Sequence, residues 1–154
     1  MKGLETNVMV QVAVAVEDIE AVAKKIADIF NMEVPPIYDL HESEEYGNYY
    51  KGNPTKAYCK LCYFHMGQLD LELLQPVGEP SNVRDFINKN GGNGVQHISF
   101  NVKNIDEKIK YLESKGLELV TNGFFPGGKC AFLKFPEIGT EIELLEGSSS
   151  VKLD

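Results

Sequence analysis

The sequence predicts a single α+β domain built from two copies of one module, and the main observation behind this prediction is an internal repeat. Residues 10–20 (VQVAVAVEDIE) align without gaps with residues 96–106 (QHISFNVKNID), and each stretch continues into a helical pattern. Near the ends of the two halves, residues 69–75 (LDLELLQ) align with residues 140–146 (TEIELLE). Self-similarity at a long period indicates duplication of a folding unit.

Length and composition agree with one folded domain. A chain of 154 residues can bury one core but is short for two ordinary domains. Apolar residues make up 43% and charged residues 25%, which is the balance of a globular protein. We expect one domain over residues 1–154, with a first module at about 7–76, a linker helix within about 77–94 and a second module at about 95–147.

The charge balance excludes several classes of partner. The formal net charge is -8 and Arg84 is the only arginine, so no basic stripe is available to neutralise phosphates. No apolar run approaches the roughly 20 residues that span a bilayer, and the N-terminus lacks the order of a signal peptide. We therefore expect a cytoplasmic protein without nucleic-acid or membrane partners.

The first half opens with a strand and a helix. Residues 8–16 alternate, with valines at even positions on one face and Met9, Gln11, Ala13 and Ala15 on the other. Apolar residues at spacings of three and four then predict a helix over residues 19–30. The equivalent helix of the second half is expected to begin at Asn104, with Glu107 completing a capping box, and to end at Gly116.

The first half also carries an insertion. Gln11 and Glu72 are 61 residues apart, whereas their counterparts His97 and Glu143 are 46 apart, which leaves about fifteen extra residues. We place these residues in 37–54, a stretch without periodicity that predicts a long loop. A short helix is expected at residues 83–90, between the halves.

The three cysteines do not indicate a zinc or redox site. Cys59 and Cys62 form a C-x-x-C, but they lie in a predicted strand over residues 57–66, where positions three apart face opposite sides. Cys130 is then an odd third thiol. We expect all three to be buried or inert thiols in a reducing compartment.

Four polar residues occupy equivalent places in the two halves. Gln11 corresponds to His97, and Glu72 corresponds to Glu143. Singly, a buried histidine is more often a hydrogen-bonded core residue, and a strand glutamate more often lies on a solvated face. If the halves pack about a pseudo-two-fold axis, however, the inner faces of four strands bring the set together. One nitrogen, one amide oxygen and two carboxylates suit a divalent cation.

The chain resembles the vicinal oxygen chelate superfamily, specifically its glyoxalase I and methylmalonyl-CoA epimerase branch. The resemblance is carried by residues 67–76 (GQLDLELLQP), 92–102 (GNGVQHISFNV), 104–106 (NID) and 141–146 (EIELLE), and it covers nearly the whole chain outside 37–54. It implies two βαβββ modules whose strands form a cup-shaped mixed sheet with helices on the outside. It also implies one divalent metal ion, for which zinc, nickel or cobalt are the first expectations. The implied ligands are Gln11, Glu72, His97 and Glu143. The resemblance further implies a homodimer.

The same resemblance implies a chemistry. In this branch the metal polarises a carbonyl and a carboxylate moves the proton on the neighbouring carbon. Glu143 would be the base and Glu72 the second candidate. The substrate would be a small carbonyl or thioester compound, and the reaction either that of glyoxalase I (lactoylglutathione lyase) or that of methylmalonyl-CoA epimerase. The ligand set resembles glyoxalase I, whereas residues 67–102 resemble the epimerases.

Two departures from the branch stand out. The epimerases carry a further glutamate that would fall here at Thr55 to Lys56, so Glu72 or one of the carboxylates Glu44 and Glu45 would have to replace it. Glyoxalases use arginines to recognise glutathione, and this chain has one arginine.

Two other functions remain as alternatives. A non-catalytic small-molecule binding protein for resistance or sequestration is the first, although such relatives commonly lose the metal ligands. An extradiol dioxygenase is the second, but it needs two histidine ligands, and only one of the three histidines of this chain, His97, lies at a candidate ligand position. His41 and His65 are expected on the surface, and residues 49–54 and 124–129 are expected either as walls of the cup or as solvated loops.

Overall fold

The computed structural model describes residues 3–39, 41 and 47–147, which form one ten-stranded mixed sheet with three α-helices. The elements in chain order are β1 (Met9–Ala15), α1 (Ile19–Phe30), β2 (Tyr38–Asp39), β3 (Gly47–Tyr50), β4 (Asn53–Thr55), β5 (Tyr58–Met66), β6 (Leu69–Val77), α2 (Asn82–Asn90), β7 (Gly94–Asn101), α3 (Ile105–Ser114), β8 (Glu118–Phe125), β9 (Gly128–Phe135), the 3-10 turn η1 (Pro136–Ile138) and β10 (Thr140–Gly147).

The strand order shows the repeat directly. The sheet runs β2-β5-β6-β1-β7-β10-β9-β8-β3-β4, so the two halves extend outward from β1 and β7 in the same order. These two strands pair antiparallel at the centre, with Gln11 opposite Ser99 and Ala13 opposite His97. Each is parallel to the last strand of its own half, β6 or β10. The predicted α+β fold with duplicated strand-and-helix units is confirmed.

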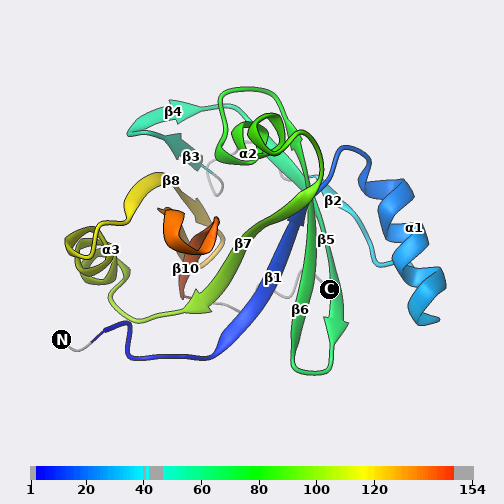
Figure 1. Ribbon diagram of the computed structural model, residues 1–154, viewed down its shortest axis with the longest axis horizontal. Coiled ribbons are helices and arrows are strands. Elements are labelled where there is room, and N and C mark those ends of the chain that lie inside the picture. The colour runs from blue at the N-terminus through cyan, green and yellow to red at the C-terminus, as the bar shows by residue number, and fades with distance from the viewer. Residues whose placement is uncertain (1–2, 40, 42–46, 148–154) are drawn as a thin grey trace.

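Helices α1 and α3 cover the outer face of the curled sheet, one on each half (Figure 1). Helix α1 buries Ile19 and Ala23 against Phe64 and Leu73, and α3 buries its apolar residues against the strands of the second half. Helix α2 instead packs on the inner face, where Val83 and Ile87 meet apolar side chains of β1 and β6. Helix α2 therefore covers one end of the inner face, and the cavity lies on the remaining part of that face.

The helix starts are held by equivalent residues of the two halves. Gln75 Oε1 accepts a hydrogen bond from the Ile19 amide at 2.9 Å. The two carboxylate oxygens of Glu146 accept from the Asn104 and Ile105 amides at 2.7 and 2.9 Å. The capping box predicted from Asn104 is wrong, because this residue has φ 55 and its side chain makes no cap hydrogen bond. A carboxylate from the last strand caps α3 instead.

Where the structure describes the predicted loop, at residues 37–39, 41 and 47–54, most of the chain is strand and not loop; residues 40 and 42–46 lie outside the described residues. Residues 47–55 form the hairpin of β3 and β4, and β3 pairs antiparallel with β8, with Tyr50 opposite Thr121. The insertion of the first half thus extends the far edge of the second half, as Figure 1 shows. Its strand character was hidden because the pairing partner lies about seventy residues away in the sequence, beyond any local pattern.

The two cysteines of β5 face opposite sides of the sheet, as predicted. In β5, Cys62 is fully buried beneath α1, whereas Cys59 lines the inner cavity, so the two face opposite sides. All three cysteines are free thiols. Within the described residues, no helix has the length and apolar character needed to cross a membrane.

Candidate functional site

The structure brings the four predicted residues together in one cavity of about 210 Å³ on the inner face. Gln11 comes from β1, Glu72 from β6, His97 from β7 and Glu143 from β10, which are four consecutive strands of the sheet. His97 is 1% exposed, Glu72 5% and Glu143 7%. Three ionisable side chains so deeply buried need partners, because burial of unpaired charge is costly.

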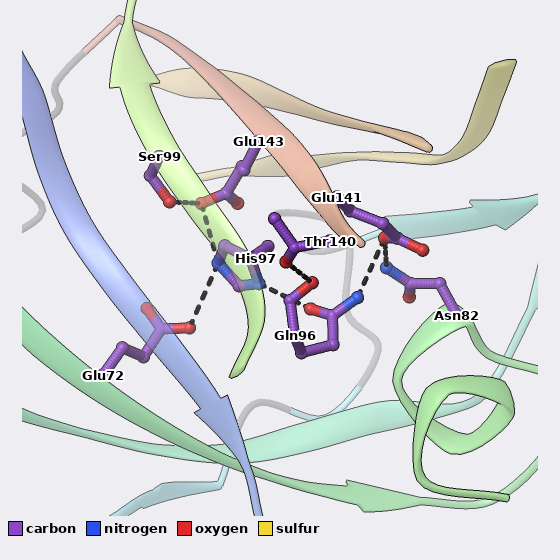
Figure 2. A network of polar contacts seen from close by, with 8 residues as sticks. All are labelled: Glu72, Asn82, Gln96, His97, Ser99, Thr140, Glu141 and Glu143. Carbon is purple, nitrogen blue, oxygen red and sulfur yellow. Dashed lines mark hydrogen bonds and ion pairs between the residues drawn. The ribbon is translucent and has the colours of Figure 1, made fainter. Parts of the chain in front are cut away.

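The contacts within this group leave two polar atoms unused. His97 Nε2 lies 3.4 Å from Glu143 Oε1 and 3.8 Å from Glu72 Oε1 (Figure 2). Ser99 donates its hydroxyl to Glu143 Oε1 at 2.6 Å. Gln11 Oε1 and His97 Nε2 are buried without a hydrogen-bond partner. Buried polar atoms are rarely left unpaired, so these two atoms are suited to bind a ligand or an ion in the cavity.

The electrostatics of the group show a shortage of positive charge. Burial raises the pKa of Glu72 to about 7, and the Glu143 carboxylate adds to this, while His97 and the Tyr63 hydroxyl oppose it. Burial also acts to lower the pKa of His97, but the carboxylates of Glu143 and Glu72 outweigh it and raise that pKa. Both shifts follow from two buried carboxylates that face one imidazole. A cation in the cavity would relieve the same imbalance.

The chemical types of the four donor groups match those that a divalent cation prefers. A cation would meet the unpaired Gln11 oxygen, the unpaired His97 nitrogen and two carboxylates, which borderline divalent ions accept. Among the residues that the structure describes, no group of three or more His, Cys, Asp and Glu side chains by itself stands ready to hold a metal ion. The fit therefore rests on donor chemistry and on the two unpaired atoms.

A buried polar network that the sequence did not predict lies behind His97 (Figure 2). His97 Nδ1 is 2.6 Å from Gln96 Oε1, and Gln96 Nε2 donates to Glu141 Oε1 at 2.9 Å. Asn82, on α2, donates to the same Glu141 oxygen at 2.8 Å. The Thr140 hydroxyl donates to the Gln96 carbonyl at 2.8 Å. Strict alternation along β7 would place Gln96 on the face opposite His97, so the sequence pattern pointed away from this contact.

The remaining walls of the cavity are largely apolar. Phe132 meets the His97 ring edge-on, with centroids 5.0 Å apart. Other walls come from Leu74 and Leu145, and from Phe124 and Phe125 of the predicted stretch 124–129. The inserted hairpin supplies further lining residues, namely Asn48, Tyr50 and Thr55. Within the described ranges, no lysine or arginine lines the cavity.

Several predicted residues fall outside the group of four. Thr55, near the position of the further epimerase glutamate, lines the cavity but donates its hydroxyl to the Pro80 carbonyl at 2.9 Å. His41 and His65 are exposed, as expected. Glu44 and Glu45 lie outside the described residues.

Two cysteines also line the cavity. Burial raises the pKa of Cys59 to about 12 and that of Cys130 further still, so both thiols stay protonated at neutral pH. A protonated thiol is a poor nucleophile, which agrees with the inert thiols that the sequence predicted.

The fold and the position of the site define the class of protein. The chain belongs to the Glyoxalase/Bleomycin resistance protein/Dioxygenase superfamily, whose sequence profile matches residues 10–148. It is 26% identical to the mitochondrial methylmalonyl-CoA epimerase of Mus musculus over 111 residues, which is 72% of this chain and 54% of that protein. It is 27% identical to the ethylmalonyl-CoA/methylmalonyl-CoA epimerase of Cereibacter sphaeroides over 112 residues, which is 73% of each.

Solved structures of epimerases share the fold. The methylmalonyl-CoA epimerase of Mycobacterium tuberculosis superposes with a TM-score of 0.63 at 18% identity, over 100% of this chain and 96% of that one. A Streptomyces coelicolor methylmalonyl-CoA epimerase variant in complex with 2-nitronate-propionyl-CoA gives 0.58 at 21% identity, over 92% and 97%. The match to the mammalian epimerases spans only about half of their length.

Proposed function

We propose that this protein is a metal-dependent enzyme that moves a proton on the carbon next to a carbonyl. Between the two candidate reactions, we favour the isomerisation of the methylmalonyl-CoA epimerase type over the glyoxalase I reaction. The observation that carries the proposal is the convergence of Gln11, Glu72, His97 and Glu143 on one cavity, where the Gln11 oxygen and the His97 Nε2 atom are buried and unpaired. The epimerase relatives support this reaction over that of glyoxalase I, which the ligand set resembles.

The four residues would hold one divalent ion, with zinc, nickel or cobalt the first candidates. When bound, such an ion would polarise the substrate carbonyl and stabilise the negative charge that forms next to it. Gln11 and His97 would serve as neutral ligands, and the two glutamates would balance the charge of the cation. The same four side chains would thereby fix the position of the substrate carbonyl relative to the carboxylates.

Glu143 is proposed as the base that takes the α-proton. Ser99 donates to one of its oxygens at 2.6 Å and so orients the carboxylate toward the cavity. Glu72 approaches from the other half of the sheet, and burial raises the pKa of its carboxyl. If the reaction is an epimerisation, Glu72 is the candidate that returns a proton to the opposite face, because Thr55 offers no carboxylate.

The dimensions of the cavity limit what the site can take. Its volume of about 210 Å³ lies below the roughly 300–1,000 Å³ of typical small-molecule pockets. The cavity therefore suits the short reacting end of a thioester or carbonyl compound, and a larger carrier would lie outside it. The Streptomyces coelicolor epimerase variant is in complex with 2-nitronate-propionyl-CoA, which supports a CoA thioester as the first substrate class to test.

A direct experiment tests this proposal. Protein purified without chelators would be analysed for metal, and then incubated in deuterated water with short acyl-CoA thioesters or with hemithioacetals of small ketoaldehydes. We expect one divalent ion per chain and deuterium at the α-carbon of one substrate class. Metal without exchange on any substrate would favour the small-molecule binding protein, and no metal at all would overturn the proposal. The homodimer and the cytoplasmic location remain predictions.

A further inference from the structure

We infer that Gln96 and Glu141 form a positioning relay that keeps a proton on His97 Nδ1 and leaves the Nε2 lone pair directed into the cavity. The inference rests on the proposed function only in assigning a metal to that lone pair. Its first test, the position of the proton on the ring, requires no metal. The relay consists of His97, Gln96, Glu141 and, from α2, Asn82.

A β-bulge puts Gln96 within reach of the imidazole. In the pairing of β1 with β7, Ala13 lies opposite His97 and the next residue, Val14, lies opposite Val95. Gln96 is the extra residue between these two pairs, so it escapes the alternation of the strand. Bulges occur next to functional sites, where they redirect a side chain. Gln96 is fully buried at 0% exposure, and its amide lies against the ring nitrogen that faces away from Glu72 and Glu143.

The order of donors and acceptors follows from the chemistry of Glu141. An ionised carboxylate only accepts hydrogen bonds, so the Gln96 NH₂ group must face it at 2.9 Å. The Gln96 oxygen then faces His97 and needs a donor, which the ring supplies from Nδ1 at 2.6 Å. In a neutral imidazole the other nitrogen carries the lone pair. This nitrogen is the unpaired Nε2 that lines the cavity.

Glu141 is itself held from two sides. Asn82 and Gln96 both donate to its Oε1 atom, at 2.8 and 2.9 Å, and Lys134 lies opposite it in the pairing of β10 with β9. Glu141 is buried, with 8% of the residue exposed, which limits the access of competing water to the relay. Helix α2 therefore contributes to the site although it supplies none of the four candidate ligands.

Removal of the acceptor should free the ring. A partner on the remote nitrogen of a metal-bound histidine fixes its tautomer and orientation, and its loss typically lowers metal affinity by about 10- to 100-fold. We expect this loss for Gln96→Met, which keeps the approximate size of the side chain but offers no amide oxygen. The double variant Gln96→Glu with Glu141→Gln reverses the amide and the carboxylate but keeps an acceptor at Nδ1, and should stay within about threefold of the wild type.

The experiment combines two measurements on the full chain. Nitrogen–proton NMR of the imidazole in metal-free protein, at a pH where His97 is neutral, should show a slowly exchanging proton on Nδ1 in the wild type and in the double variant. This signal should be lost in Gln96→Met. Calorimetric titration with zinc alone then reports affinity. Thr140→Val is the matched control, because it removes a hydrogen bond to the Gln96 backbone and leaves the relay intact.

The outcomes separate the relay from a packing role. In the wild-type protein, a neutral His97 imidazole with its proton on Nε2 would overturn the inference. This measurement needs no variant, so it tests the inference even if Gln96→Met does not fold. An affinity loss in Gln96→Met with the Nδ1 proton retained also overturns it, because the side chain would then act through packing. A confirmed tautomer in a protein that binds no zinc supports the relay and contradicts the proposed metal site.

Discussion

The two halves of the sheet share one design but differ at the positions that surround the site. In the second half, Gln96 and Glu141 support His97 from behind, and Ser99 donates to Glu143. Their counterparts in the first half, by the alignment of the repeat, are Val10, Asp70 and Ala13. None of these can reproduce the contacts. Val10 and Ala13 carry no polar side chain, and Asp70 pairs with His65 at the surface, at 2.8 Å.

This difference indicates that the polar groups of the second half are more firmly oriented than those of the first half. The second half presents an oriented imidazole and a carboxylate held by a hydroxyl, so its polar groups are preorganised. The first half presents an amide whose oxygen has no partner and a carboxylate, Glu72, that the Tyr63 hydroxyl contacts and whose pKa burial raises to about 7. We expect substitutions in the second half to have larger effects than equivalent ones in the first.

The largest expected effect follows from removal of the second-half ligands. His97→Ala and Glu143→Ala should each abolish tight binding of a divalent ion, because each removes a donor that the cavity cannot replace. Metal content after purification without chelators measures this, and His65→Ala, an exposed histidine on the neighbouring strand pair, is the control. Full metal content in both variants would rule out the site.

The next effect separates binding from chemistry. Glu143→Gln keeps an oxygen that can accept the Ser99 hydrogen bond but cannot take a proton at neutral pH. Metal binding should weaken only in part, whereas exchange of the substrate α-proton with deuterated water should fall by about 10²-fold or more. The equivalent Glu72→Gln in the first half should lower exchange less. Wild-type exchange rates in metal-loaded Glu143→Gln would assign the base to Glu72.

A third effect concerns stability and compares the helix starts of the two halves. Glu146→Ala removes a charged acceptor from two backbone amides of α3, and should lower the free energy of unfolding by about 1–3 kcal/mol. Gln75→Ala removes one neutral acceptor from α1, whose start is also held by Asp18. It should cost about 0.5–1.5 kcal/mol. Urea unfolding measures both; equal losses would contradict the asymmetry.

The sequence predicted what depends on periodicity and duplication. The alternating pattern of residues 8–16 and the repeat at residues 96–106 sufficed to place Gln11 and His97 on one inner face. What it missed depends on contacts between distant segments. The hairpin of β3 and β4 is stabilised by the edge of β8, and Gln96 reaches His97 through a bulge that breaks the alternation. Neither leaves a local signature.

The smallest expected effect is on the amide ligand of the first half. Gln11→His should preserve folding and metal binding, because histidine supplies a nitrogen donor at the same inner-face position of β1 and Gln11 Oε1 has no hydrogen bond to lose. Zinc affinity by calorimetry and thermal unfolding should both stay near the wild-type values. Gln11→Leu is the matched control: it keeps the approximate volume without a donor, and should weaken zinc binding while leaving the fold intact. Loss of metal in a folded Gln11→His variant, or unchanged affinity in Gln11→Leu, would show that Gln11 is not a ligand. The second half would then hold the ion with Glu72 alone from the first.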